Sequence, residues 1–230
     1  MSDRTDRSFS AVIFDMDGVL ADSEPLYLAA TNAVLEPLGR RLSEDQSRAF
    51  MGSSVTNSWL EIMGALGLGG DLEKYVSDYD RHLLRLLGEP RETLPGVRSL
   101  IERLRERHVP IGLASSSWRT WVDTLLAATG LDGIFDAVVA GDMVKDEKPA
   151  PDVFLLAAKE LGVPPDRCIA LEDTPTGLAA ARAAGMFAVQ VRSASTAFPP
   201  LAEADLVLES LGDFDLSLVE GHEAGEAQSP

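Results

Sequence analysis

Two aspartates stand one residue apart near the start of the chain, in the stretch "AVIFDMDG" at residues 11–18. The apolar run before them is typical of a buried strand, which predicts Asp15 and Asp17 at its carboxyl end. Backbone alternation would send both side chains to the same side of that strand. Two close carboxylates repel, and burying them is costly unless a cation neutralises them. The pair therefore predicts a cation site, where Gly18 would let the backbone turn closely around a ligand.

A second pair of acids ends another apolar run, in "CIALEDTPTG" at residues 168–177. Glu172 and Asp173 stand directly before a helix for which Thr174 is the expected N-cap. Taken alone, Asp173 could serve merely to cap that helix. Together with the first pair, the acids predict a site for a hard cation, and carboxylate ligands suit Mg²⁺. A calcium loop fits poorly, because a glycine directly follows the second aspartate and the later spaced acids are missing.

Three serines follow a third apolar run, in "GLASSSW" at residues 112–118. Ser117 is expected to be the N-cap of the next helix. Hydroxyls and free N–H groups at a helix N-terminus also favour an anion, so Ser115 and Ser116 are candidate phosphate contacts. A serine nucleophile is not favoured, since the histidines that could activate it lie outside the motifs, at positions 82, 108 and 222.

A lysine in "KDEKPAPDVF", residues 145–154, is the candidate counter-charge for these acids. Lys148 precedes a proline-rich entry into a helix, which would hold it in place. From there its ammonium could offset both the carboxylates and a substrate phosphate. Lys145 is the alternative for this role, although neighbouring prolines constrain it less.

The segments that must position these residues alternate between short apolar runs and amphipathic helices. Such alternation with short loops predicts an α/β fold with a doubly wound, Rossmann-like parallel sheet. Five apolar runs and a weaker sixth are expected to be strands: residues 11–14, 109–114, 136–141, 167–172, 187–191 and 205–210. Residues 24–92 interrupt the alternation with four helical patterns and are expected to form an inserted helical cap. The catalytic core would then comprise residues 1–23 and 93–220, and residues 221–230 would be a flexible tail.

Composition and charge limit the classes of partner and the compartment that are expected. The chain of 230 residues carries 20 basic and 37 acidic side chains, a net charge of −17, which argues against nucleic acid as a partner. Cys168 is the single cysteine and is expected to be a core residue in a reducing compartment. No apolar stretch reaches membrane-spanning length, so a cytoplasmic protein without a membrane partner is expected.

Four motifs taken together resemble the haloacid dehalogenase-like hydrolase superfamily: "FDMDGVLADSE", "LASSS", "KPAPDVF" and "LEDTPTG". Their order, spacing and strand context all match, and the resemblance covers nearly the whole chain. It is closest to the branch that holds β-phosphoglucomutase and the small sugar-phosphate and polyol-phosphate phosphatases. The second aspartate of the first motif argues for phosphate chemistry, because the true dehalogenases of the superfamily lack it.

The resemblance implies a two-step phosphoryl transfer. Asp15 would attack phosphorus and form an aspartyl-phosphate, while Asp17 would act as general acid and then as general base. Ser115 and Lys148 would hold the phosphoryl oxygens. Mg²⁺ would be bound by Asp15, the backbone carbonyl of Asp17, Asp173 and, through water, Glu172.

Departures from the branch separate phosphatase from mutase. β-Phosphoglucomutase-like proteins carry a histidine where this chain has Tyr27, and a lysine and an arginine in the cap where it has Met51 and Val55. Holding a bisphosphate needs that positive charge, although Arg48 could partly substitute. Hydrolysis of a monophosphate is therefore favoured over the alternative, a sugar-phosphate isomerase. A non-catalytic binding protein is less favoured, because every catalytic position holds the right residue type.

The substrate is expected to be a small phosphorylated metabolite, and the protein a monomer or weak homodimer. Selectivity should reside in the cap and the hinge leading into it. The candidate substrate-binding residues are Gly18, Ser116, Ser23, Glu24 and Tyr27, with Ser53, Ser54, Asn57 and Trp59 as possible further contacts.

Overall fold

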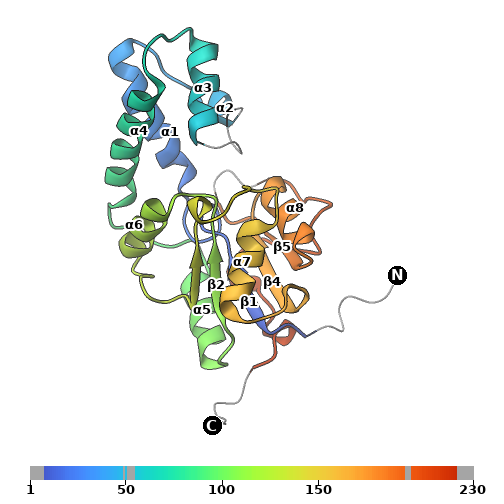
Figure 1. Cartoon of the computed structure of the whole chain (residues 1–230). Helices are drawn as coiled ribbons and strands as arrows, with labels where there is room; N and C mark the ends of the chain where they lie inside the picture. The colour runs from blue at the N-terminus through green and yellow to red at the C-terminus, as the bar shows by residue number, and fades with distance from the viewer. Residues whose placement is uncertain (1–7, 49, 51–54, 195–197, 222–230) are drawn as a thin grey trace, which may run out of the picture.

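A computed structural model describes residues 8–48, 50, 55–194 and 198–221 of the chain (Figure 1). Its centre is a six-stranded sheet in the order β3-β2-β1-β4-β5-β6, in which every neighbouring pair is parallel. Each predicted run supplies one strand, so the predicted fold is confirmed. The strands are β1 (Ala11–Phe14), β2 (Ile111–Ala114), β3 (Ala137–Val139), β4 (Cys168–Glu172), β5 (Phe187–Val191) and β6 (Leu206–Leu208).

Helices cover both faces of the sheet (Figure 1). Along β1, Val12 and Phe14 belong to one buried cluster and Ala11 and Ile13 to another, as alternation of a strand requires. The first cluster includes residues of α5 (Val97–Glu106) and α6 (Arg119–Thr129). The second includes residues of α7 (Asp152–Leu161) and α8 (Pro175–Ala183). Burial of β1 on both faces explains why its sequence is continuously apolar.

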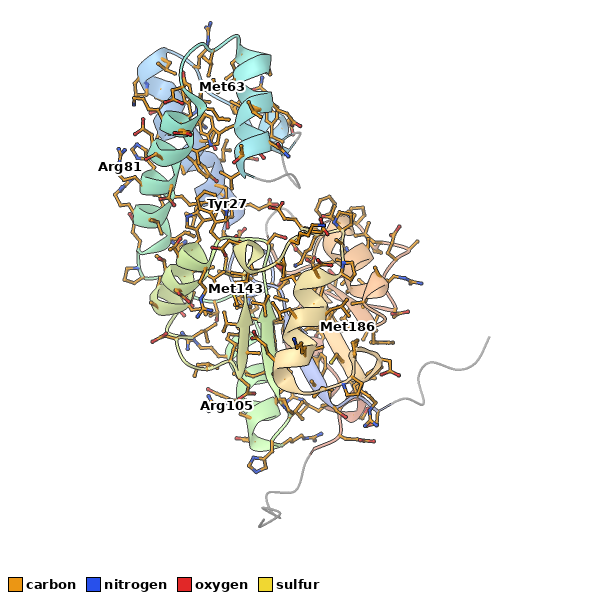
Figure 2. The ribbon with its side chains drawn as sticks, in the orientation of Figure 1. Tyr27, Met63, Arg81, Arg105, Met143 and Met186 are labelled. Carbon is orange, nitrogen blue, oxygen red and sulfur yellow. The ribbon has the colours of Figure 1, made fainter. Side chains whose placement is uncertain are left out.

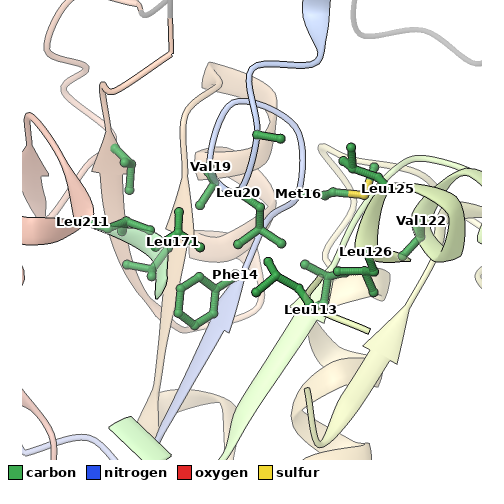
Figure 3. Packing of buried hydrophobic residues seen from close by; sticks show 14 of the residues in the cluster. Phe14, Met16, Val19, Leu20, Leu113, Val122, Leu125, Leu126, Leu171 and Leu211 are labelled. Atoms are coloured by element: carbon green, nitrogen blue, oxygen red, sulfur yellow. The ribbon is translucent and has the colours of Figure 1, made fainter. Parts of the chain in front are cut away.

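The loop after β1 is anchored by its own apolar residues (Figure 3). Met16 and Leu20 are buried in the same cluster as Phe14, together with Leu113 of β2 and Leu126 of α6. The side chains on either side of Met16 are therefore held at the carboxyl edge of the sheet.

Four further helices lie beyond the carboxyl ends of the strands (Figure 1). They are α1 (Glu24–Leu35), α2 (Glu44–Arg48), α3 (Val55–Leu66) and α4 (Leu72–Leu87), each inside a predicted helical segment. The α4 helix packs on α1, α3 and α6. At the contact with α6, the Trp121 indole nitrogen donates to Asp80 Oδ1 at 2.6 Å, and the Trp121 and Tyr79 rings lie 5.9 Å apart. The division into a core and a cap of residues 24–92 stays a prediction.

The observed helix ends can be compared with the predicted caps. Thr174 Oγ1 accepts from the N–H of Gly177 at 3.1 Å, so the predicted N-cap is confirmed. Gly130 ends α6 in the left-handed conformation. The prediction for Ser117 is wrong: the N-cap of α6 is Trp118, with no side-chain capping bond. The Ser117 hydroxyl is instead turned to Asp17. Within the described ranges, no helix is both long and apolar enough to cross a membrane.

Candidate active site

The acids of the two motifs meet because β1 and β4 are neighbours in the sheet. Phe14 pairs with Leu171, so Asp15 and Glu172 leave the sheet side by side, with Asp173 one residue later. Asp15, Glu172 and Asp173 each place an oxygen within 4.8 Å of the others, and all three residues are buried. The structure thus brings together three of the four predicted metal ligands. The fourth, Asp17, was predicted to contribute its backbone carbonyl, which stays a prediction, and its carboxylate is bonded to hydroxyl groups instead.

Lys148 reaches the same point from the loop between β3 and α7. Its Nζ donates to Asp15 Oδ1 at 2.6 Å, to Glu172 Oε1 at 2.9 Å and to the Ala114 carbonyl at 3.1 Å. Burial opposes its charge, but the two carboxylates raise the pKa of Lys148 above its ordinary value. Lys145, the alternative, has a side chain that is 88% exposed and pairs with Asp146 at 3.6 Å. The site lysine is therefore Lys148.

The cluster contains more buried carboxyl groups than cations. One ammonium faces three carboxylates, and Asp173 Oδ1 is buried with no hydrogen-bond partner among the described residues. Burial raises the pKa of Asp15 to about 8 and that of Asp173 well above its usual range, with the neighbouring acids adding to both effects. A buried oxygen without a donor, among hard carboxylate ligands, fits a divalent cation such as Mg²⁺.

Glu172 is held from both sides. Its Oε1 accepts from Lys148, and its Oε2 accepts from the backbone N–H of Thr174 at 2.7 Å and from the Thr174 hydroxyl at 3.0 Å. Gly177 leaves room for this carboxylate, because a Cβ there would lie 1.6 Å from Glu172 Oε1. Glu172 therefore orients the lysine as well as adding charge to the cluster.

Gly18 is required by both its conformation and its surroundings. Its φ is +74°, and a Cβ would lie 2.0 Å from Asp173 Oδ2. We expect Gly18→Ala to lower the free energy of unfolding by about 2–4 kcal/mol, from left-handed strain and overpacking together. The control is Gly39→Ala, where φ is +69° and nothing lies within 4 Å of the added methyl group. Urea unfolding of both variants checks this, and equal losses would contradict the close approach to Asp173.

Asp17 has neutral neighbours. Its Oδ1 accepts from the Ser23 hydroxyl and from the Tyr27 hydroxyl at 2.9 Å, while its Oδ2 accepts from Ser117 Oγ at 2.9 Å. Burial raises the pKa of Asp17, and these hydroxyls oppose that shift. Whereas Asp15 lies beside an ammonium and two acids, Asp17 lies among hydroxyls. Two carboxylates in such different surroundings are suited to different chemical roles.

The Tyr27 hydroxyl connects the inserted helices with the sheet. Tyr27 belongs to α1, and Figure 2 shows it at the end of these helices that faces the core. Its hydroxyl also lies 2.9 Å from Ser117 Oγ, which follows β2. Asp17 is therefore held by residues from both parts of the molecule.

A cavity of about 280 Å³ joins these groups. Asp15, Asp17, Lys148 and Asp173 line it, together with residues of α1, α3 and α4. Its size suits a small metabolite better than a large ligand.

The comparisons with known proteins agree with this arrangement. Residues 12–191 match the model of the family described as haloacid dehalogenase-like hydrolase. The chain belongs to this family. The prediction that it is an enzyme, a phosphoric monoester hydrolase, is also confirmed.

Two curated relatives and one crystal structure illustrate the similarity. The fructose-1-phosphate phosphatase YqaB of Escherichia coli is 38% identical over 80% of this chain and 97% of its own length. The β-phosphoglucomutase of Bacillus subtilis is 33% identical over 94% of this chain and 95% of its own length. The crystal structure of a CbbY mutant from Rhodobacter sphaeroides with xylulose-1,5-bisphosphate superimposes with a TM-score of 0.81 at 26% identity, covering 92% of this chain and 99% of that one.

In this hydrolase the three serines at residues 115–117 lie in two different environments. Ser116 and Ser117 line the cavity. Ser115 is fully buried, and its Oγ accepts from the Ser117 N–H at 3.0 Å. Its predicted contact with a phosphoryl group stays a prediction.

Only some of the predicted substrate contacts of the hydrolase line the cavity. Glu24, Tyr27 and Trp59 line the cavity, whereas Asn57 is exposed and does not line it. Ser23 is buried and bonds to Asp17, as described above. The described residues do not include Met51, Ser53, Ser54 or the side chain of Arg48. The part of the comparison with the mutase that rests on Met51 and Arg48 therefore stays a prediction.

Sequence reasoning missed several residues of the hydrolase site. A glycine in the first turn of α8 is unfavourable for a helix, which could have indicated the close approach of Gly177 to another group. The cavity also takes residues that read as ordinary hydrophobic helix positions, and no local signal distinguishes them. They are Ile62, Tyr79, Trp118 and Trp121.

Proposed function

We propose that this hydrolase is a Mg²⁺-dependent phosphatase that removes the phosphoryl group from a small sugar or polyol monophosphate. The observation that carries the proposal is the pair of aspartates on one short loop. Asp15 lies in the anionic cluster with Lys148, and Asp17 lies 2.9 Å from each of two hydroxyls on the same cavity. Named phosphatases among the curated relatives support it.

We assign the residues the roles that the family resemblance implies, and the surroundings of Asp15, Asp17 and Lys148 support them. An oxygen of Asp15 attacks phosphorus, the bond from phosphorus to the ester oxygen breaks, and the leaving oxygen takes a proton from Asp17. The aspartyl-phosphate on Asp15 is then hydrolysed by a water that gives its proton to Asp17. Lys148 and Ser115 hold the phosphoryl oxygens, on which negative charge is spread during transfer.

The metal would be held by Asp15 and Asp173, by the backbone carbonyl of Asp17 and, through water, by Glu172. When bound, Mg²⁺ supplies positive charge that lets a phosphate dianion approach an acidic cluster. Lys148 keeps Glu172 directed into the site, and Thr174 fixes the other oxygen of that carboxylate.

A sugar-phosphate isomerase is the second candidate, and the similarity to the β-phosphoglucomutase of Bacillus subtilis favours it. Such an enzyme must hold two phosphates. Among the described residues that line the cavity, Lys148 alone is a lysine or arginine. Hydrolysis is therefore the better supported reaction.

The hydroxyl of Tyr27 is expected to position Asp17. We expect Tyr27→Phe to lower kcat by about tenfold and to change KM little, because Asp17 loses a donor while the ring is kept. The matched control is Tyr75→Phe, which removes a hydroxyl bonded to the Gly69 carbonyl at 3.0 Å and keeps a ring that does not itself line the cavity. Phosphate release measured over a range of substrate concentrations separates the two constants. A rise in KM with kcat unchanged would show that Tyr27 binds substrate instead of positioning Asp17.

The proposed function is tested by phosphate release from sugar and polyol monophosphates with Mg²⁺, with EDTA, and after Mg²⁺ is restored. We expect release with the metal, a loss of about a hundredfold or more with EDTA, and recovery on restoration. Full activity in EDTA would exclude the metal requirement. Conversion of one sugar monophosphate into its isomer by catalytic amounts of a sugar bisphosphate would favour the isomerase.

A further inference from the structure

One end of the cavity is walled by rings and aliphatic side chains. Trp59 and Ile62 come from α3 and Tyr79 from α4, and all three are buried. The Trp59 ring lies 5.8 Å from Tyr79, and Tyr79 lies 5.9 Å from Trp121 of α6. We call this end of the cavity the aromatic chamber. Its further walls are Leu42, Phe50, Val55 and Trp118.

The rings hold one another in place. Trp59 stacks on Tyr75 at 5.5 Å, and Trp118 stacks on Trp121 at 4.6 Å. The Trp121 nitrogen is fixed by Asp80. A ligand that enters the chamber therefore meets preformed flat surfaces, which lose little conformational freedom on binding.

The described residues of the chamber are unsuited to a second phosphate. The acidic residues Glu24 and Glu147 line the same cavity, and the one described basic residue there, Lys148, is already bonded to Asp15 and Glu172. A second phosphate in the described cavity would find no uncommitted lysine or arginine side chain to pair with.

Several hydroxyl groups that line the cavity already donate a hydrogen bond to another group of the protein. Thr31 Oγ1 donates to the Tyr27 carbonyl at 2.9 Å, and Ser58 Oγ donates to the Phe50 carbonyl at 3.0 Å. The Tyr27 hydroxyl donates to Asp17. Contact between apolar surfaces is therefore a large part of what this region offers a ligand, with the Tyr79 hydroxyl as a polar group on the same wall.

We infer that the alcohol half of the substrate is an uncharged group with a ring that presents an apolar face to the aromatic chamber, and that it bears no second phosphate. This inference rests on the proposed phosphatase function and narrows it. The phosphate lies at the acids and Lys148, and the ring lies between α3, α4 and α6. A sugar ring or a planar heterocycle fits the aromatic chamber, because either can stack on indole and phenol faces.

Two matched pairs of substrates test the inference in the unmodified protein. Benzyl phosphate and ethyl phosphate both release a primary alcohol but differ by a ring. Fructose 6-phosphate and fructose 1,6-bisphosphate share the ring but differ by a phosphate. With Mg²⁺, we expect kcat/KM to be about tenfold or more higher for benzyl phosphate than for ethyl phosphate, and about tenfold lower for the bisphosphate than for the monophosphate.

Variants locate the preference in the chamber. Trp59→Leu should reduce the ratio of benzyl to ethyl phosphate toward one, and Trp118→Leu, at a partly exposed ring, repeats the test where loss of Trp59 impairs folding. Phe187→Leu is the control, since it removes a ring that packs against Phe9 outside the cavity lining. This control should keep the ratio of the unmodified protein.

The outcomes separate the two proposals. Equal efficiency for benzyl and ethyl phosphate, or a preference for the bisphosphate, would overturn the inference while the phosphatase function stands. Absence of phosphate release from every ester would overturn the phosphatase function and the inference with it.

Discussion

Asp15→Asn is expected to lower phosphate release by about a thousandfold or more while the fold is kept. The amide has nearly the same shape but is a poor nucleophile. The substitution also removes one acid from the cluster with Glu172 and Asp173, which relieves repulsion, and it weakens the 2.6 Å bond from Lys148, because an amide oxygen accepts that bond without a carboxylate charge. Because Lys148 keeps Glu172 as a partner, we expect the free energy of unfolding to change by about 1 kcal/mol or less.

Steady-state phosphate release and urea unfolding measure the two effects separately. Asp146→Asn is the control, an aspartate whose side chain is 59% exposed and paired with Lys145. Mass spectrometry of acid-quenched peptides should detect a phosphate adduct on Asp15 in the unmodified protein. A variant that retains a tenth of the activity or more would contradict the assignment of Asp15 as nucleophile.

Lys148→Met is expected to impair both stability and activity. The methionine keeps an apolar stem near Phe154, whose ring centre lies 4.7 Å from Nζ, but the buried carboxylates of Asp15 and Glu172 lose their ammonium partner. Removing one side of a buried ion pair typically costs about 3–5 kcal/mol, and we expect a loss of this order without metal. Phosphate release should fall about a thousandfold, because Lys148 is assigned to the phosphoryl oxygens as well.

Lys145→Met is the matched control, since it removes the same charge from the same loop at an exposed position. Mg²⁺ should recover part of the lost unfolding free energy of Lys148→Met, because a ligand that binds only the folded state stabilises it. Equal stability of the two lysine variants in metal-free buffer would show that the buried acids need no counter-charge from Lys148.

The acidic cluster was predictable because its members are fixed by the strands that precede them. Asp15 and Glu172 each end an apolar run, and parallel strands bring their carboxyl ends to one edge of the sheet. The choice of Lys148 over Lys145 also followed from the prolines around Lys148. Local pattern was sufficient wherever a residue's position depended on a single strand or turn.

The neighbours of Asp17 were not predictable in the same way. Ser117, 100 residues away, meets Asp17 because β2 lies beside β1 in the sheet. Tyr27, 10 residues away, meets it only because of how α1 packs over the sheet. The sequence around Ser117 resembles an ordinary helix start, so the capping prediction was reasonable but wrong. The aromatic chamber is similar: Trp121 has the spacing of a core residue, and only the packing of α4 on α6 makes it a wall of the cavity.

The chain has three tryptophans, and all of them line the one cavity: Trp59, Trp118 and Trp121. Tryptophan emission from the unlabelled protein therefore arises entirely from the walls of the proposed substrate site. Its intensity and wavelength should respond to occupancy of that cavity, without contribution from a tryptophan elsewhere. Affinities of unreactive analogues can thus be read by titration of the native chain.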